Sequence, residues 1–171
     1  APAAQGADPT WPCIQRKVPS LSLGQVWNGP ELPLSAAEWA KDPAISALVR
    51  ETAARRVPVG EAEEAITGFV RGQAKDERNE RLAMLAQGLF DHMNAERADV
   101  IAGIARYAQN QLAMAARLRA EGSEFAKLRA DPDAGADEII TRTEQLTLET
   151  RIFEERVQAL TYVCEVPTMI E

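Results

Sequence analysis

The chain has 171 residues, a length that suits one domain with a hydrophobic core of its own. Its formal net charge is −7, from 26 acidic and 19 basic residues, which disfavours sequence-independent binding to nucleic acid or to an anionic lipid surface. The sequence lacks an apolar run of roughly 18 residues that could cross a membrane. We therefore expect no transmembrane segment, and any membrane association to be peripheral and through a partner.

The first 34 residues form a leader that is rich in proline and tryptophan. Six of the ten prolines lie in this leader, and proline fixes φ and removes a backbone donor, so we expect extended, non-helical backbone. The leader also carries large apolar side chains, including Trp11 and Trp27, which favour packing over disorder. We expect it to lie in a groove, either of this chain or of a partner, and not to form an independent domain.

Two cysteines lie near opposite ends of the sequence, at Cys13 and Cys164. The first residues, Ala-Pro-Ala-Ala-Gln, are typical of what remains after a signal peptide is removed, so we expect an exported protein, most simply a periplasmic one. Oxidising compartments favour pairing of an even number of cysteines. We predict a Cys13–Cys164 disulfide that brings residues 11–14 beside residues 160–165; two unrelated buried thiols are the alternative.

Helical signals begin after the leader, in the region 35–171. A short turn over 35–39 comes first, and Asp42 followed by Pro43 then marks a helix start, because the carboxylate caps free N–H groups and proline fits the first turn. We expect a helix over Pro43–Arg56. A second helix should begin near Glu61, with a buried face formed by Ile66, Phe69 and Val70.

A long proline-free segment follows, from Asp76 to Glu121. Its apolar residues recur at helical spacing, which predicts either one long helix or two helices joined by a kink near Asn94 or Gly103. Gly122 with the serine after it predicts a break, and we expect only a short helical piece over 125–129 before a loop.

The final segment, Asp137 to Glu165, has the clearest pattern. Its apolar and small residues alternate in steps of four and three, as in the seam of a coiled coil. The predicted seam consists of Ile139, Thr143, Leu146, Thr150, Phe153, Val157, Leu160 and Cys164. We therefore predict an all-α fold over 35–171, an antiparallel helical bundle with two long C-terminal helices and the leader packed on it.

His92 is the only histidine, which removes most metal and acid–base chemistry from consideration. His92, Glu96 and Asp99 fall at i, i+4 and i+7 on one helical face, and are the candidates for a metal site. A haem bundle would pair His92 with a distant ligand such as a methionine. A histidine that borders the core accounts for the same pattern, and we expect no cofactor.

No spacing in the sequence indicates a catalytic triad, a phosphate loop or a dinucleotide site. We expect a non-enzymatic accessory or binding subunit that docks on a larger envelope complex, with a protein partner or a homo-oligomer. A stress-type helical chaperone or sensor is the first alternative, and a haem or metal bundle the second. Tryptophan is enriched at interaction hot spots, so Trp11, Trp27 and Trp39 are the partner-binding candidates; anchoring of the leader in the core is the competing role.

Overall fold

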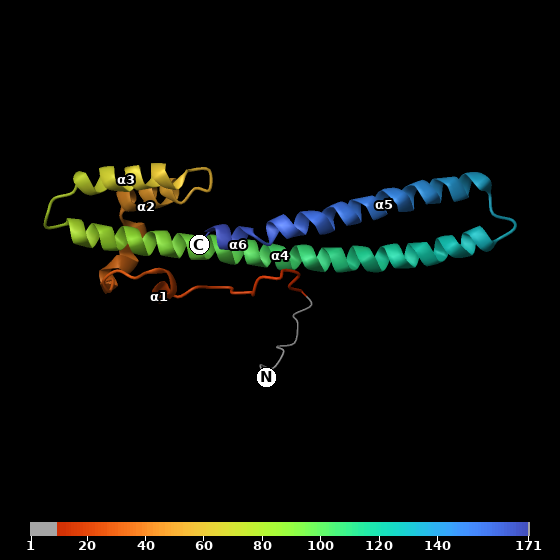
Figure 1. Cartoon of the computed structure of the whole chain (residues 1–171), viewed down its shortest axis with the longest axis horizontal. Coiled ribbons are helices and arrows are strands. Elements are labelled where there is room, and N and C mark those ends of the chain that lie inside the picture. Colours follow the sequence, from red (N-terminus) through yellow and green to blue (C-terminus); the bar gives the residue numbers. More distant parts are fainter. Residues whose placement is uncertain (1–9, 171) are drawn as a thin grey trace, which may run out of the picture. The chain divides into compact units, whose positions relative to one another are not determined.

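The computed structural model describes residues 10–170, and every regular element in that range is a helix (Figure 1). The expected all-α fold is confirmed. None of the helices in the described range is long and apolar enough to span a membrane. In chain order the elements are α1 (Leu23–Val26), the 3₁₀ helix η1 (Leu34–Lys41), α2 (Pro43–Thr52), α3 (Val59–Arg71), α4 (Arg78–Ala130), α5 (Ala136–Val163) and α6 (Val166–Ile170).

The described residues divide into two compact units. The first, here called the hairpin unit, comprises residues 10–17 and 100–166. The second, here called the core unit, comprises residues 18–99 and 167–170. Each unit contains part of the leader and part of α4, whereas the division at residue 34 that composition suggests stays a prediction.

In the core unit, α2 begins directly after Asp42, as the sequence predicts. The Asp42 carboxylate accepts hydrogen bonds from the backbone N–H groups of Ala44 at 2.9 Å and Ile45 at 3.0 Å, so it satisfies two donors that α2 leaves free. Arg81 of α4 donates to the same carboxylate at 2.7 Å. The cap thus fixes the start of α2 and ties it to α4.

α2 and α3 differ from the expected boundaries by a few residues. α2 ends at Thr52 and not at Arg56, because a turn between Ala54 and Val57 precedes Pro58, and a residue before proline disfavours the helical conformation. α3 starts at Val59, two residues before the expected start. The expected inner residues of α3, namely Ile66, Phe69 and Val70, are half-buried.

The hydrophobic core lies where α2 meets α4. Its fully buried residues come from both helices, and partly buried side chains of η1, α3 and α4 pack around them. Gly88 allows this approach, since a Cβ there would lie 2.8 Å from atoms of both Trp39 and Val49. The buried cluster consists of Ile45, Leu48, Val49 and Leu85.

α4 is one helix of 53 residues, which resolves the choice between one helix and two. The predicted break at Gly122 is wrong, because the helix runs through this residue to Ala130. A glycine costs a helix only about 1 kcal/mol relative to alanine. The half-buried Leu118, Phe125 and Leu128 continue the inner row of α4 past Gly122, and packing of this row outweighs the local penalty.

In the hairpin unit, α5 runs back along α4 in the antiparallel sense (Figure 1). Side chains between Tyr107 and Arg117 of α4 bridge to the stretch of α5 between Glu149 and Arg156. The Tyr107 hydroxyl donates to the Arg156 carbonyl at 3.0 Å, and Arg117 pairs with Glu149 at 3.0 Å. Two long antiparallel helices are therefore present in this unit, whereas the bundle as a whole stays a prediction.

The predicted seam of α5 is only half right. The members at every seventh position, Ile139, Leu146, Phe153 and Leu160, are half-buried, and Cys164 just after the helix is buried. The intervening Thr143, Thr150 and Val157 are exposed. One neighbouring helix covers only one row of side chains, so α5 contains no fully buried residue.

The leader is not wholly extended, so the prediction of a leader without helix needs correction. Residues 23–26 form the single turn of α1, which starts where the Ser22 backbone N–H donates to the Gln25 side chain at 2.7 Å. No proline lies between Pro19 and Pro30, which leaves this turn free to form. Leu21 exchanges two hydrogen bonds with the Asn94 side chain of α4, at 2.9 and 3.0 Å.

Candidate functional site

An apolar groove with a volume of about 870 Å³ lies in the core unit. It is lined by the end of the leader, the start of η1, α3 and the first turns of α4. Ten of its fourteen lining residues are apolar. The lining consists of Trp27, Pro30, Glu31, Leu32, Pro33, Ser35, Ile66, Asn79, Glu80, Leu82, Ala83, Leu85, Ala86 and Leu89.

α4 contributes the largest share of the groove. Leu82, Ala86 and Leu89 recur at i, i+4 and i+7, so they lie along one face of the helix. Leu82 and Leu89 are both half-buried, and the small side chains of Ala83 and Ala86 leave space beside them. The groove therefore presents ridges of leucine with small residues between them, the kind of surface against which a second helix packs.

Trp27 forms part of the leader side of the groove. Its indole N–H donates to the Pro30 carbonyl at 2.8 Å, which ties the ring to the turn that follows it. Gly29 is required for this arrangement, because a Cβ there would lie 2.4 Å from the indole. The side chain is still 37% exposed, and Leu34, the first residue of η1, is 97% exposed. Large apolar surface thus remains accessible beside the groove.

The charged residues of the groove are both acidic. Glu31 comes from the leader and Glu80 from the first turn of α4, and the lining contains no lysine, arginine or histidine. Within residues 10–170, neither carboxylate has a hydrogen bond or an ion pair. The nearest basic side chains along α4 are engaged, since Arg78 donates to the Gln73 carbonyl at 3.4 Å and Arg81 pairs with Asp42.

The three candidate tryptophans have different surroundings. Trp39 packs against the core cluster, and its indole N–H donates to the Asp91 carboxylate at 2.8 Å, so it anchors η1 on α4. Trp11 belongs to the hairpin unit, where its indole N–H donates to the Gln15 carbonyl at 2.7 Å and Lys17 lies over its ring. Trp27 is the candidate that lines the groove.

The candidate metal ligands are not brought together. His92 Nε2 lies 4.0 Å from Glu96 Oε1, but Glu96 also accepts from Arg55 at 3.2 Å, and Asp99 is exposed. Within residues 10–170, no group of three or more His, Cys, Asp or Glu side chains is placed to hold a metal ion. This region therefore gives no geometric support for a metal-binding function.

The predicted disulfide joins Cys13 to Cys164, with an S–S distance of 2.08 Å and Cα atoms 5.5 Å apart. The bond links two positions 151 residues apart in the sequence. It places the start of the described leader beside the end of α5, as expected for residues 11–14 and 160–165. The bond therefore closes the hairpin unit covalently.

Arg97 is a structural residue that the sequence pattern does not reveal. Only 2% of it is exposed, and its guanidinium donates to the Pro167 carbonyl at 3.2 Å and to the Val18 carbonyl at 3.5 Å. In the sequence, Arg97 reads as a polar interruption of the apolar stripe. In the core unit it joins the leader and the C-terminal residues to α4, which helps to fix the leader that lines the groove.

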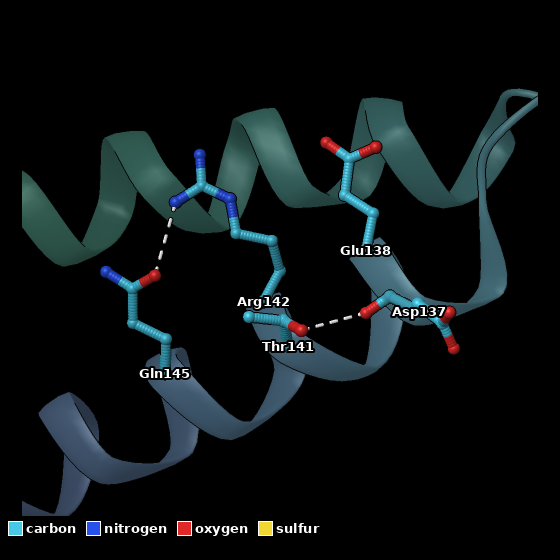
Figure 2. A pocket seen from close by; sticks show the side chains of 5 residues that line it. All are labelled: Asp137, Glu138, Thr141, Arg142 and Gln145. Atoms are coloured by element: carbon cyan, nitrogen blue, oxygen red, sulfur yellow. Dashed lines mark hydrogen bonds between the residues drawn. The ribbon is translucent and has the colours of Figure 1, made fainter.

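A second depression lies on the first turns of α5 (Figure 2). All five of its lining residues come from this one helix, and their hydrogen bonds are to residues of the same helix. Thr141 donates to the Asp137 carbonyl at 2.9 Å, and Arg142 donates to the Gln145 side chain at 3.4 Å. Because no second element helps to enclose this surface, it has the character of a solvated helix face. The residues are Asp137, Glu138, Thr141, Arg142 and Gln145.

Comparison of the chain with models of known protein families, with curated protein sequences and with solved structures finds no significant match. The residues of the groove are therefore the basis on which a function is assigned.

Proposed function

We propose that the chain is an exported, non-enzymatic helical accessory subunit that docks on a larger envelope complex through the groove beside Trp27. The occupant of the groove is a helix of the protein partner. The observation that carries this proposal is the groove itself. It has a volume of about 870 Å³ and a mostly apolar lining, and it is bordered by a tryptophan that is 37% exposed. Exposed apolar surface of this kind commonly marks a binding site.

The chemistry of the groove favours a helix over an extended peptide. One mode of extended-peptide binding adds a strand to a sheet edge, and the described residues contain no strand. Pro30 and Pro33, in the leader side of the groove, have no backbone N–H to offer such a peptide. The i, i+4, i+7 row of Leu82, Ala86 and Leu89 is instead suited to the apolar face of an amphipathic helix.

The Cys13–Cys164 disulfide supports the exported part of the proposal. Structural disulfides persist in secreted proteins and in the bacterial periplasm, whereas cytosolic thiols are usually kept reduced. A disulfide that closes the hairpin unit suits a protein that works in an oxidising envelope compartment. The periplasm is the compartment we propose.

Site-specific crosslinking in the native host tests this proposal. A photoreactive benzoylphenylalanine at position 27 should give one discrete adduct with an envelope protein, and mass spectrometry should map it to a helical segment of that protein. The same probe at Val59, which is 75% exposed and outside the groove lining, is the matched control and should give no such adduct. Ala86→Leu, which fills the groove, should abolish the adduct.

Three results would contradict the proposal. The absence of an adduct would leave the groove without a protein occupant, and an adduct with a second copy of the chain would indicate a homo-oligomer. Adducts with many unrelated proteins would indicate the chaperone alternative. In that case, wild type should suppress aggregation of a denatured test protein and Ala86→Leu should not.

A further inference from the structure

We infer that the docking helix is amphipathic and basic, with lysine or arginine side chains beside its apolar face that pair with Glu31 and Glu80. This inference rests on the proposed function and specifies the partner further. Its basis is the charge of the groove lining, in which two carboxylates stand among apolar residues without any basic residue.

The two carboxylates come from different elements of the groove. Glu31 belongs to the leader and Glu80 to the first turn of α4, so a helix in the groove would meet negative charge from both elements. Glu80 also has a local role, because an acidic side chain in a first turn favours the N-terminal end of the helix dipole. Glu31 lies outside any helix, so it has no such role, and stabilisation of a helix end does not explain an acidic residue at this position.

The negative charge of the groove is not neutralised by its own neighbours. Arg81 forms an ion pair with Asp42, with 2.7 Å between Nη1 and Oδ2, and Arg78 donates a hydrogen bond to the Gln73 carbonyl. The net charge of −7 adds a long-range field of the same sign. A partner helix with acidic residues beside its apolar face would therefore be repelled, and one with basic residues would be attracted.

The charge preference should be measurable but moderate. Ion pairs open to solvent contribute little, and two of them together correspond to about a five- to tenfold difference in affinity between a basic and an acidic helix. Added salt should reduce the difference, because exposed charges are screened at high ionic strength. The apolar contacts should supply most of the affinity in both cases.

A displayed library of amphipathic helices provides the test, with the purified, disulfide-bonded full chain as bait. Each helix has about 18 residues, apolar residues at i, i+3, i+4 and i+7, and flanking positions randomised between lysine and glutamate. Selection should enrich lysine at the flanking positions. The best clone should bind about five- to tenfold more tightly than its lysine-to-glutamate counterpart in calorimetry.

Two pairs of substitutions locate the effect. Glu31→Gln with Glu80→Gln should remove the lysine preference. Glu63→Gln with Glu64→Gln makes the same charge change at exposed positions of α3 outside the groove lining, and should leave the preference intact. Trp27→Ala and Ala86→Leu should each weaken binding of every clone, and circular dichroism should show that both variants stay folded.

The outcomes separate this inference from the proposed function. If helices bind and Trp27→Ala weakens them, but lysine and glutamate are recovered equally, the groove docks a helix and the charge inference is overturned. If the lysine preference survives Glu31→Gln with Glu80→Gln, the inference is likewise overturned. If no helix binds, or binding is indifferent to both groove variants, the inference and the proposed function fall together.

Discussion

The hairpin unit and the core unit are stabilised by different interactions. In the core unit, α2 and α4 bury four apolar side chains against each other, and the rest of the unit packs around that cluster. In the hairpin unit, Ile101, Ile104 and Ala108 of α4 are buried, but α5 buries no residue fully along its 28 residues. It is held by a single row of half-buried side chains, by a few bridging hydrogen bonds, and by a disulfide just beyond its last turn.

This difference shows what two helices can and cannot do alone. A pair of helices has one shared seam, so most side chains remain in water and little apolar surface is removed. A third packed element changes this, as η1 and α3 do for α2 and α4 in the core unit. In the hairpin unit, α5 itself contains no fully buried residue, and the disulfide adds stability there by restricting the unfolded chain.

Removal of the disulfide should give the largest effect. Cys13→Ser with Cys164→Ser opens a connection over 151 residues and should cost about 3–5 kcal/mol of unfolding free energy, because the unfolded chain regains its entropy. Urea unfolding measures the loss. Hydrogen exchange should accelerate most in α5, while the amides of Ile45 to Val49 stay protected. Equal acceleration of exchange in both units would contradict the idea that the hairpin unit depends more on the disulfide than the core unit does.

The next largest effect should come from the core cluster. Ile45 is fully buried, so Ile45→Ala should cost about 3 kcal/mol through lost burial and the cavity left behind. The matched control is Leu148→Ala in α5, where the side chain is 59% exposed, and it should cost under about 0.5 kcal/mol. Chemical denaturation of both variants provides the comparison. Similar losses would mean that α5 buries far more than its exposure indicates.

Two glycines in the same helix should respond with opposite signs. Gly88→Ala places a Cβ 2.8 Å from Trp39 and Val49 and should cost about 1–3 kcal/mol through overpacking. Gly122→Ala meets nothing within 4 Å and should stabilise α4 by roughly 0.5–1 kcal/mol. Thermal unfolding followed by circular dichroism compares the two. A loss of stability in Gly122→Ala would show that the hairpin unit packs more tightly there.

A smaller loss of stability than for Ile45→Ala should come from the cap of α2. Asp42→Ala should cost about 1–2 kcal/mol, because two backbone donors lose their acceptor and Arg81 loses its partner. Asp42→Asn keeps a capping oxygen without the charge and should cost less. Denaturant titrations of the two variants separate the cap from the ion pair. Equal costs would assign the whole effect to the charge.

The same carboxylate predicts a pH dependence. The hydrogen bond from the Ile45 backbone N–H, assisted by Arg81 and by the Ala44 N–H, holds the pKa of Asp42 below its ordinary value of 3.8. The stabilisation from Asp42 is therefore present above pH 3.8 and is lost as the pH falls through the lowered pKa of the folded state. Asp42→Asn should lose less stability than wild type over that acidic range. Identical acid titrations would contradict this assignment.

Local signals in the sequence predicted local structure. The Asp42–Pro43 start of α2 is correct because capping depends on residues within one turn. The break at Gly122 is wrong because a local penalty of about 1 kcal/mol competes with packing along a whole helix. The seam of α5 is half right because a heptad pattern does not reveal how many neighbouring helices are present to cover it.

The candidate site was only partly predictable. Trp27 was among the candidates, but the sequence could not distinguish it from Trp39, whose indole is held in the core by Asp91. The groove combines residues from 27 to 89, and no periodic pattern connects the leader with α4. Arg97 could not be identified as a buried residue, because a buried arginine is recognisable only through the carbonyl groups that surround it.

The three tryptophans lie in different environments, so their intrinsic fluorescence can report on different parts of the chain. Trp11 lies in the hairpin unit, Trp39 in the core, and Trp27 at the groove. Because each indole donates its N–H to a different acceptor, their emission spectra should respond to different events. A quencher in solution should reach the 37% exposed ring of Trp27, and an occupant of the groove should shield that ring without any added label.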